Sequence, residues 1–233
     1  MEFFQNNPID EIYGISDMLR AKTESTIGEG SVTASPCMKL SPEKSAESLN
    51  LLKTSISGCK KCGLSSTRTN IVFGEGNPSA RLMFIGEGPG ADEDASGRPF
   101  VGRAGQLLTK MIEAMGFNRE EVYIANIVKC RPPGNRNPSA DEAAACIDYL
   151  KEQIRLVCPE FIICLGSVAV TYLFGEAVKI TQVRGTWRDF QGCKVMLSYH
   201  PAFLLRSPDR KKEAWVDLQL VMKAMSENNK SEK

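Results

Sequence analysis

Short apolar runs that alternate with segments of helical periodicity limit the possible folds of this chain more than any other feature. Apolar runs predict strands at residues 81–86, 121–128, 160–165 and 194–198. Apolar residues spaced three or four apart predict helices at 103–115, 139–157, 167–174 and 213–225. Strands and helices in alternation form a mostly parallel sheet covered on both faces. We therefore expect an α/β fold, a three-layer sandwich with a central, mostly parallel sheet of four strands flanked by helices.

One compact domain is expected, preceded by an N-terminal helix and a linker. Apolar residues at helical spacing predict a short helix within residues 1–22, and residues 23–45 have the Ser, Thr, Gly, Glu and Pro content of a flexible linker. The compact domain is expected to span residues 46–233 and to begin with a helix. Within it, Gly116 is a candidate C-cap, and Ser139 is a candidate N-cap with Glu142 at the spacing of a capping box.

Composition excludes some classes of protein. The N-terminus has no secretory signal and no apolar run has the length of a membrane span, so a cytoplasmic protein is expected. The net charge of +1 is not that of a general nucleic-acid binder, which would need its basic residues on one face. Candidate basic clusters are Lys60/Lys61, Lys129/Arg131/Arg136 and Arg206/Arg210/Lys211/Lys212.

Four of the eight cysteines have the spacing of a metal site: Cys59 and Cys62 form a Cys-x₂-Cys pair, and Cys130 and Cys146 follow later. In a reducing compartment such cysteines bind metal more often than they form disulfides. Neighbouring basic residues favour the thiolate form. Ordinary core packing and a redox pair are the alternatives. Four thiolates suit either zinc or an iron–sulfur cluster.

Polar segments follow three of the predicted strands, where ligands bind in parallel α/β sheets. The glycine-rich loop 86–90 includes Glu87 but lacks the lysine and the spacing of nucleotide-binding loops, so no nucleotide cofactor is expected. A tight turn with an acidic surface loop is the alternative. Asn126 lies among apolar residues, where it is either a structural amide or a group that reads the edge of a planar base.

His200 is the chain's one histidine and follows the fourth strand. The residues after it, Phe203-Leu204-Leu205-Arg206, combine apolar side chains with an arginine. Such a segment suits a wedge that enters a duplex and displaces a base.

Together these segments resemble the iron–sulfur type of uracil-DNA glycosylase, called family 4. Gly86-Glu87-Gly88-Pro89-Gly90, followed by Glu93-Asp94, is similar to the first motif of that family. Residues 98–105 resemble its pocket segment, His200-Pro201-Ala202 resembles its last motif, and the four cysteines have the spacing of its cluster ligands. The resemblance covers about residues 46–226.

The resemblance implies a monofunctional enzyme that flips uracil out of DNA and hydrolyses its bond to deoxyribose, leaving an abasic site. It implies that Phe100 stacks on uracil, Asn126 pairs with its polar edge and His200 binds a carbonyl on which negative charge develops. Glu87 and Gly88 belong to the pocket loop, with Asp92 or Asp94 as alternatives to Glu87 for the catalytic carboxylate. Leu204, Leu205 and Arg206 would form the wedge and a phosphate contact.

The implied cofactor is a 4Fe-4S cluster, with zinc as the alternative, held by Cys59, Cys62, Cys130 and Cys146. The cluster would hold Lys60, Lys61 and Arg131 against DNA. The implied partner is uracil-containing DNA, single- or double-stranded, bound by a monomer at the nucleoid and not at a membrane. Two other hypotheses are a non-catalytic DNA-binding module that keeps the fold and an electron carrier built on the cysteines.

Overall fold

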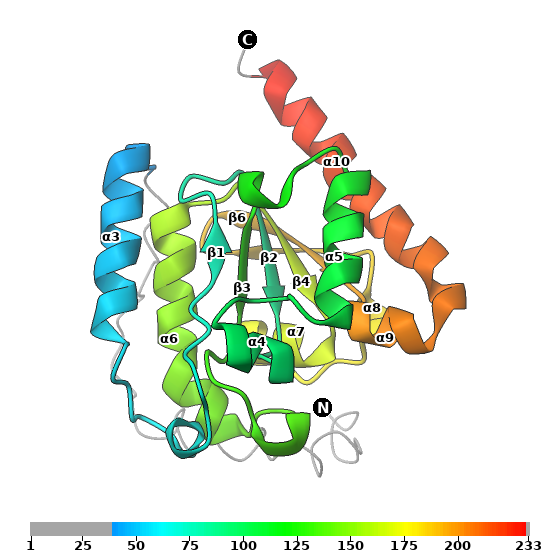
Figure 1. Ribbon diagram of the computed structural model, residues 1–233. Helices are drawn as coiled ribbons and strands as arrows, with labels where there is room; N and C mark the ends of the chain where they lie inside the picture. The colour runs from blue at the N-terminus through cyan, green and yellow to red at the C-terminus, as the bar shows by residue number, and fades with distance from the viewer. Residues whose placement is uncertain (1–38, 232–233) are drawn as a thin grey trace, which may run out of the picture.

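The computed structural model describes residues 39–231 and contains one six-stranded sheet in the order β1-β3-β2-β4-β6-β5 (Figure 1). The strands are β1 Glu75–Gly76, β2 Leu82–Gly86, β3 Tyr123–Asn126, β4 Phe161–Leu165, β5 Trp187–Phe190 and β6 Cys193–Ser198. The four predicted strands are β2, β3, β4 and β6, and they pair in parallel. The expected parallel core of an α/β sandwich is therefore present.

The prediction of four strands was too low, because β1 and β5 pair antiparallel at the two edges and make the sheet mixed. β1 is two residues long, and β5 has exposed central residues, so neither forms an apolar run that the sequence could reveal. β5 joins β6 through a two-residue hairpin at Gln191 and Gly192, both with positive φ, as a tight hairpin turn requires.

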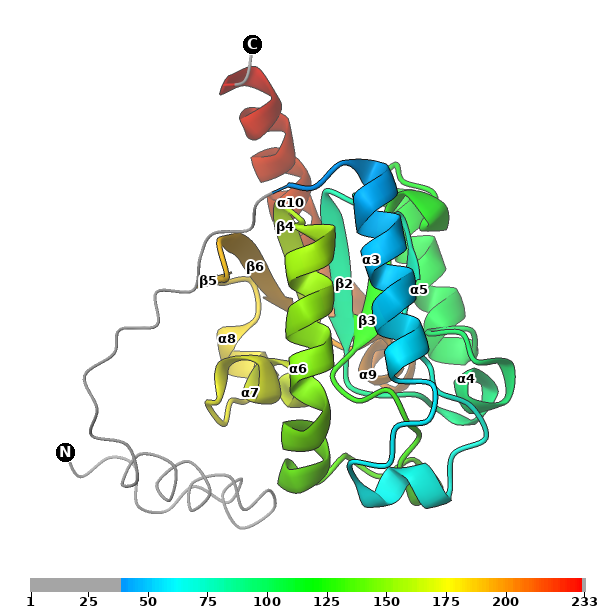
Figure 2. The ribbon, with the colours of Figure 1, turned by 90° about the vertical axis from the view of Figure 1, so that its left-hand side faces the viewer.

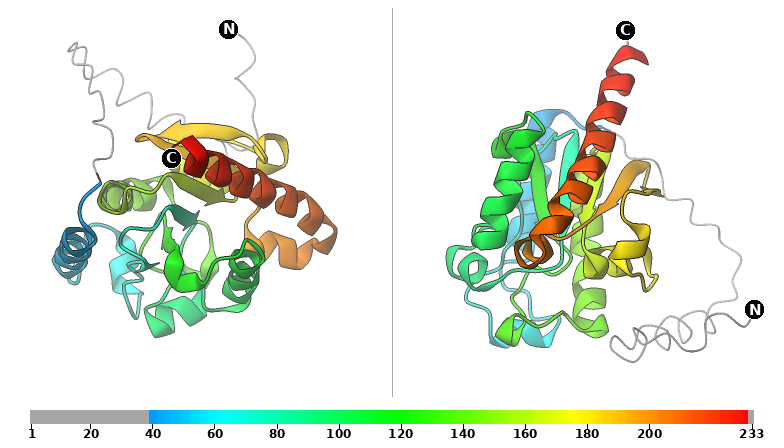
Figure 3. Two further views of the ribbon diagram at one scale, coloured as in Figure 1. Left: turned by 90° about the horizontal axis from the view of Figure 1, so that it is seen from above. Right: turned by 90° about the vertical axis from the view of Figure 1, so that its right-hand side faces the viewer.

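Helices cover both faces of the sheet in three layers. One face packs in a core with α3, α6 and α7, and the other with α5, α9 and α10. Figure 2 and the right-hand view of Figure 3 show these two sides of the molecule. The α-helices are α3 Pro42–Ser55, α4 Ala91–Ser96, α5 Arg103–Ala114, α6 Ala140–Val157, α7 Ser167–Phe174, α8 Ile180–Val183, α9 Pro201–Arg206 and α10 Lys211–Ser231. Short 3₁₀ helices are η1 Gly63–Ser66, η2 Arg119–Glu121, η3 Pro133–Asn135 and η4 Pro208–Arg210. No helix among residues 39–231 combines the length and the apolar character needed to cross a bilayer.

The compact fold begins earlier than residue 46. Ser41 accepts a hydrogen bond as the N-cap of α3, Pro42 occupies the first helical position, and Lys39 forms an ion pair with Glu160. Serine and proline here start a helix, although the same residue types indicated a linker in the sequence. The helix expected within residues 1–22 lies outside the described residues.

Capping signals in the sequence were confirmed at two helices. The Ser139 hydroxyl accepts from the Glu142 N–H, and the Glu142 carboxylate accepts from the Ser139 N–H, which completes the capping box of α6. Gly116, just beyond α5, has a φ of 83°. Capping residues contact backbone groups close to them in the sequence, so they can be predicted without knowledge of the tertiary fold.

Parallel pairing brings the polar strand ends together. Gly86 lies opposite Asn126 in the β2–β3 pair, and Leu165 lies opposite Ser198 in the β4–β6 pair. Glu87 follows β2 directly, and His200 is the N-cap of α9, two residues after β6. The same edge of the sheet therefore carries Glu87, Asn126 and His200.

Candidate active site

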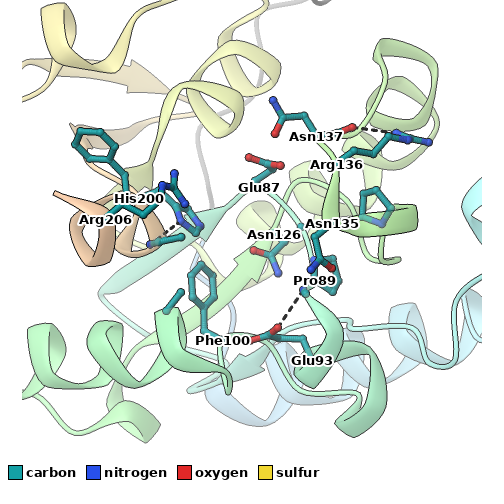
Figure 4. Close-up of a pocket in the computed structure, with 16 residues that line it drawn as sticks. Glu87, Pro89, Glu93, Phe100, Asn126, Asn135, Arg136, Asn137, His200 and Arg206 are labelled. Carbon is teal, nitrogen blue, oxygen red and sulfur yellow. Dashed lines mark hydrogen bonds between the residues drawn. The ribbon is translucent and has the colours of Figure 1, made fainter.

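A cavity of about 320 Å³ opens at the carboxyl edge of the central strands (Figure 4). It brings together most of the predicted pocket residues: Glu87, Gly88, Phe100, Asn126, His200 and Arg206. Its remaining lining residues are Pro89, Gly90, Glu93, Ala104, Pro132, Asn135, Arg136, Asn137, Ala202 and Phe203. The size is that of a small-molecule or single-base site.

Asn126 carries an unpaired amide oxygen at the floor of this cavity. The residue is 2% exposed, and its Oδ1 has no hydrogen-bond partner among the described residues. Leaving a buried polar atom unpaired costs about 1–3 kcal/mol, so folded proteins rarely do it without a purpose. The Asn126 amide therefore keeps a hydrogen-bond acceptor that no described residue uses.

Phe100 supplies an apolar wall next to this amide. Its ring centroid lies 5.6 Å from that of His200, and its backbone has a φ of 52°. Glycine is required at two neighbouring positions: a Cβ at Gly86 would collide with the Phe100 ring and Asn126 Oδ1, and one at Gly105 with the Phe100 backbone. The close approach that these glycines allow places the Phe100 ring beside the Asn126 amide.

His200 is held as a neutral hydrogen-bond donor. Its Nδ1 accepts from the Ala202 N–H at 3.1 Å, at the start of α9. Burial and the positive charge of Arg206 lower the pKa of His200 to about 4, against the opposing effect of Glu93. A neutral imidazole that accepts at Nδ1 carries its proton on Nε2. The ring can therefore donate from Nε2 at neutral pH.

Glu87 places a carboxyl group in the same cavity, between His200 and Asn137 in Figure 4. Burial alone raises the pKa of Glu87 from 4.5 to about 7. The carboxyl group is thus divided between its two protonation states near neutral pH, which suits a group that acts on a proton or on developing positive charge.

Glu93 is a pocket residue whose role the sequence did not predict. Its Oε1 accepts from the N–H groups of Val101 and Gly102, both at 2.9 Å, and its Oε2 accepts from the Gly90 N–H at 3.0 Å. One carboxylate therefore joins the glycine-rich loop to the segment that carries Phe100. An acidic residue in the first turn of α4 could have suggested a capping role for Glu93. Its partners eight and nine residues later could not be predicted from the sequence.

The alternatives to Glu87 lie outside the cavity. Asp94 is 4% exposed, and its Oδ1 accepts from the backbone N–H groups of Thr69 and Asn70. Asp92 is exposed on α4. Neither side chain lines the pocket, so neither replaces Glu87 there.

The residues of the predicted wedge lie on two sides of α9, one buried and one facing solvent. Leu204 is 1% exposed and packs in the core beneath α9, so it has no surface to insert into DNA. Pro201 and Leu204, three residues apart, point inward on the same side of α9. Leu205 is half-buried and Arg206 is exposed at the pocket rim. The wedge assignment for Leu204 is therefore corrected.

The four predicted metal-binding cysteines border one second, small cavity, with Arg68, Lys129 and Tyr149. Cys59 and Cys62 follow α3, Cys130 follows β3, and Cys146 lies in α6. Three of the sulfurs accept hydrogen bonds: Cys130 from Arg68 at 3.3 Å, Cys146 from the Lys129 N–H at 3.3 Å and Cys59 from the Tyr149 hydroxyl at 3.6 Å.

This donor set fits a cluster that is held by four thiolates. Hydrogen bonds to sulfur favour the thiolate and support ligated clusters. All four cysteine side chains border the one small cavity, which is where such a cluster would lie. Burial raises the pKa of the Cys146 thiol to about 11, while Lys129 opposes this. Burial lowers the pKa of Lys129 to about 8, against the opposing effect of Cys146 and Cys130.

Other basic residues near these sites are exposed. Lys60 and Lys61 lie on the surface beside the first cysteine pair, and the Lys61 ammonium lies 4.7 Å from the centre of the Tyr149 ring. Arg136, at the pocket rim, forms a two-pronged ion pair with Glu142 at 2.7 and 2.8 Å. Exposed basic side chains thus lie beside both cavities.

Residues 73–219 match the family described as the uracil DNA glycosylase superfamily. The protein named "Type-4 uracil-DNA glycosylase" of Thermotoga maritima is 47% identical over 163 residues, 69% of this chain and 85% of that protein. Proteins of the same name from Archaeoglobus fulgidus and Saccharolobus solfataricus are 42% and 45% identical, over 75% and 77% of this chain and 92% and 88% of their own lengths. The chain therefore belongs to the uracil DNA glycosylase superfamily and, within it, to the type-4 enzymes.

Proposed function

We propose that this chain excises uracil from single- and double-stranded DNA by hydrolysis and leaves an abasic site, as a monomeric base-excision-repair enzyme of the cytoplasm. The observation that carries the proposal is the unpaired Asn126 amide oxygen in a cavity that Phe100 and His200 also line. The relatives named "Type-4 uracil-DNA glycosylase" match most of this chain and support the proposal. Each step of the reaction has a matching group in the cavity.

Recognition depends on stacking and on one polar edge. A flipped uracil would lie against the Phe100 ring, where stacking on an aromatic side chain contributes about 1–3 kcal/mol. The Asn126 amide offers both a donor and an acceptor to the base edge. Uracil and cytosine differ at this edge, because one presents a carbonyl and a ring N–H where the other presents an amine and a bare ring nitrogen. A mismatched edge would leave the buried amide unpaired.

Departure of the base is assisted by His200. The bond between N1 of uracil and C1′ of deoxyribose breaks with its electron pair leaving on the base, so negative charge builds on the uracil carbonyls and positive charge on the sugar. The Nε2–H of neutral His200 donates to a carbonyl oxygen and binds it more tightly as charge develops. His200 therefore stabilises the leaving base by a hydrogen bond, without transferring its proton to it.

Glu87 acts on the sugar side of the reaction. In its ionised form the carboxylate stabilises the sugar cation and orients a water molecule toward C1′. The water oxygen bonds to C1′ as its proton passes to the Glu87 carboxylate, and the departed uracil anion takes a proton from solvent. Gly88 keeps this loop close to Val128, since a Cβ at that position would lie 2.7 Å from the Val128 methyl group. Leu205 and Arg206, on the exposed side of α9, supply the wedge and a phosphate contact.

Cys59, Cys62, Cys130 and Cys146 would hold a 4Fe-4S cluster. When bound, the cluster provides a covalent cross-link between the segment after α3, the loop after β3 and α6. The exposed Lys60, Lys61 and half-buried Arg131 would then be presented to the DNA backbone. The catalytic groups of the cavity are all distinct from these cysteines.

The test is a glycosylase assay on an oligonucleotide with a single uracil, both single-stranded and paired with guanine. Iron-loaded protein is expected to release free uracil and to leave a site that alkali cleaves, without added metal or nucleotide. Oligonucleotides with cytosine or thymine at the same position serve as controls. An iron-loaded preparation that binds the DNA but releases no uracil would contradict the proposal and favour a non-catalytic DNA-binding module.

A further inference from the structure

A buried lysine lies between the cysteine cavity and the base pocket. Lys129 is 1% exposed, lines the cavity with the four cysteines and follows Asn126 by three residues. Burying an ammonium group is costly unless its donors are satisfied. Its hydrogen bonds therefore show what the charge is used for.

The ammonium folds back onto the strand end that carries the recognition amide. Lys129 Nζ donates to the Asn126 backbone oxygen at 2.8 Å and to Gln153 Oε1 at 2.5 Å. β1 pairs with β3 only at Tyr123 and Ile124, so the ladder does not reach the Asn126 carbonyl. The lysine supplies the donor that a longer edge strand would have supplied, and a charged donor makes the stronger bond.

The other end of this bridge is helix α6. Gln153 is fully buried, and its Nε2 donates to the Phe73 oxygen at 2.9 Å and to the Tyr123 hydroxyl at 3.2 Å. Gln153 and Cys146 are seven residues apart on α6 and thus share a face of the helix. The Lys129 N–H donates to Cys146 Sγ, so backbone and side chain of one residue contact both sites.

We propose that Lys129 is a positioning residue that ties the Asn126 peptide to α6, so that the cysteine site and the uracil pocket share one rigid support. The proposal rests on the uracil-excising function proposed above. It differs from a purely stabilising role, because it predicts that loss of the lysine weakens uracil binding and excision even when the protein is folded and iron-loaded. A displacement of about 1 Å at a recognition group can reduce a rate about a hundredfold.

The experiment compares Lys129→Met with wild type and with Lys110→Met, an exposed lysine on α5. Four quantities are measured: iron per chain, the dissociation constant of free uracil by calorimetry, the single-turnover excision rate and the affinity for uracil-free DNA. Lys129→Met is expected to bind uracil about 10- to 100-fold more weakly and to excise it slower by a similar factor per iron-loaded molecule. Its affinity for uracil-free DNA should match that of wild type.

The proposal would be overturned if iron-loaded Lys129→Met bound and excised uracil as well as wild type does. It would also be overturned if the loss of activity were fully explained by a lower iron content. If that variant does not fold, Gln153→Met decides, because it removes the other end of the bridge. Weaker uracil binding with iron retained supports the proposal, and wild-type uracil binding overturns it. A wild-type enzyme that releases no uracil would refute the proposed function instead, so the two failures are distinct.

Discussion

Replacement of Glu87 by glutamine should stabilise the protein at neutral pH while slowing the reaction. Burial raises the pKa of this carboxyl group from 4.5 to about 7. Because the folded protein holds the proton more tightly than the unfolded chain, folding stability falls as pH rises between these two values and then levels off. The amide in the Glu87→Gln variant would carry no charge to desolvate, so the variant would escape this loss.

The size of the effect follows from the shift. Each pKa unit corresponds to about 1.4 kcal/mol, so a rise from 4.5 to about 7 sets a ceiling of about 3.5 kcal/mol. Partial solvent exposure of Glu87 reduces this to about 1–3 kcal/mol. A change of that size moves the melting temperature of a chain of this length by about 3–10 °C.

The assay is a thermal melt of wild type, Glu87→Gln and Glu113→Gln at about pH 5 and about pH 8, with equal iron content. Glu113 is exposed on α5 and serves as the matched control. Glu87→Gln should melt higher than wild type at about pH 8 and close to it at about pH 5. In parallel, single-turnover excision by wild type should rise through about pH 7, and that of the variant should be slow and flat. A melting difference that is equal at both pH values, or excision that falls as pH rises through 7, would refute the reasoning.

Three further predictions concern other parts of the molecule. His200→Ala should lower the single-turnover rate about 10²–10³-fold with DNA affinity unchanged, measured by rapid quench and anisotropy, and an equal loss in both would argue against leaving-group stabilisation. Leu204→Ala should lower the free energy of unfolding by about 2–5 kcal/mol in denaturant titrations. Leu205→Ala should keep its stability and lose more excision activity on duplex DNA than on single strands. The reverse pattern would return Leu204 to the wedge. Cys62→Ser should lose iron by colorimetric assay and Cys164→Ser should retain it, and iron retained in the first would remove Cys62 from the ligand set.

The central sheet and the meeting of Glu87, Asn126 and His200 at one edge could be predicted from the sequence. The apolar runs of β2 and β4 are buried along their length, as is β6 apart from its exposed Lys194. A run of this kind indicates a buried parallel strand. Parallel strands have their carboxyl ends at one edge, so the polar residues that follow them had to gather there. The edge strands were missed because an exposed or two-residue strand has no period to detect.

Side-chain direction was the part that could not be predicted. Leu204 and Leu205 are adjacent and chemically equal, yet one is core and the other faces outward, because the packing of α9 against the sheet sets the phase of that helix. Glu93 was noted in the sequence only as part of a family motif, and Lys129 only as part of a candidate basic cluster. Their functions depend on partners brought close by the fold: amides eight and nine residues away for Glu93, and a glutamine from α6 for Lys129. Local periodicity is encoded along the chain, whereas such contacts exist only after distant segments have packed together.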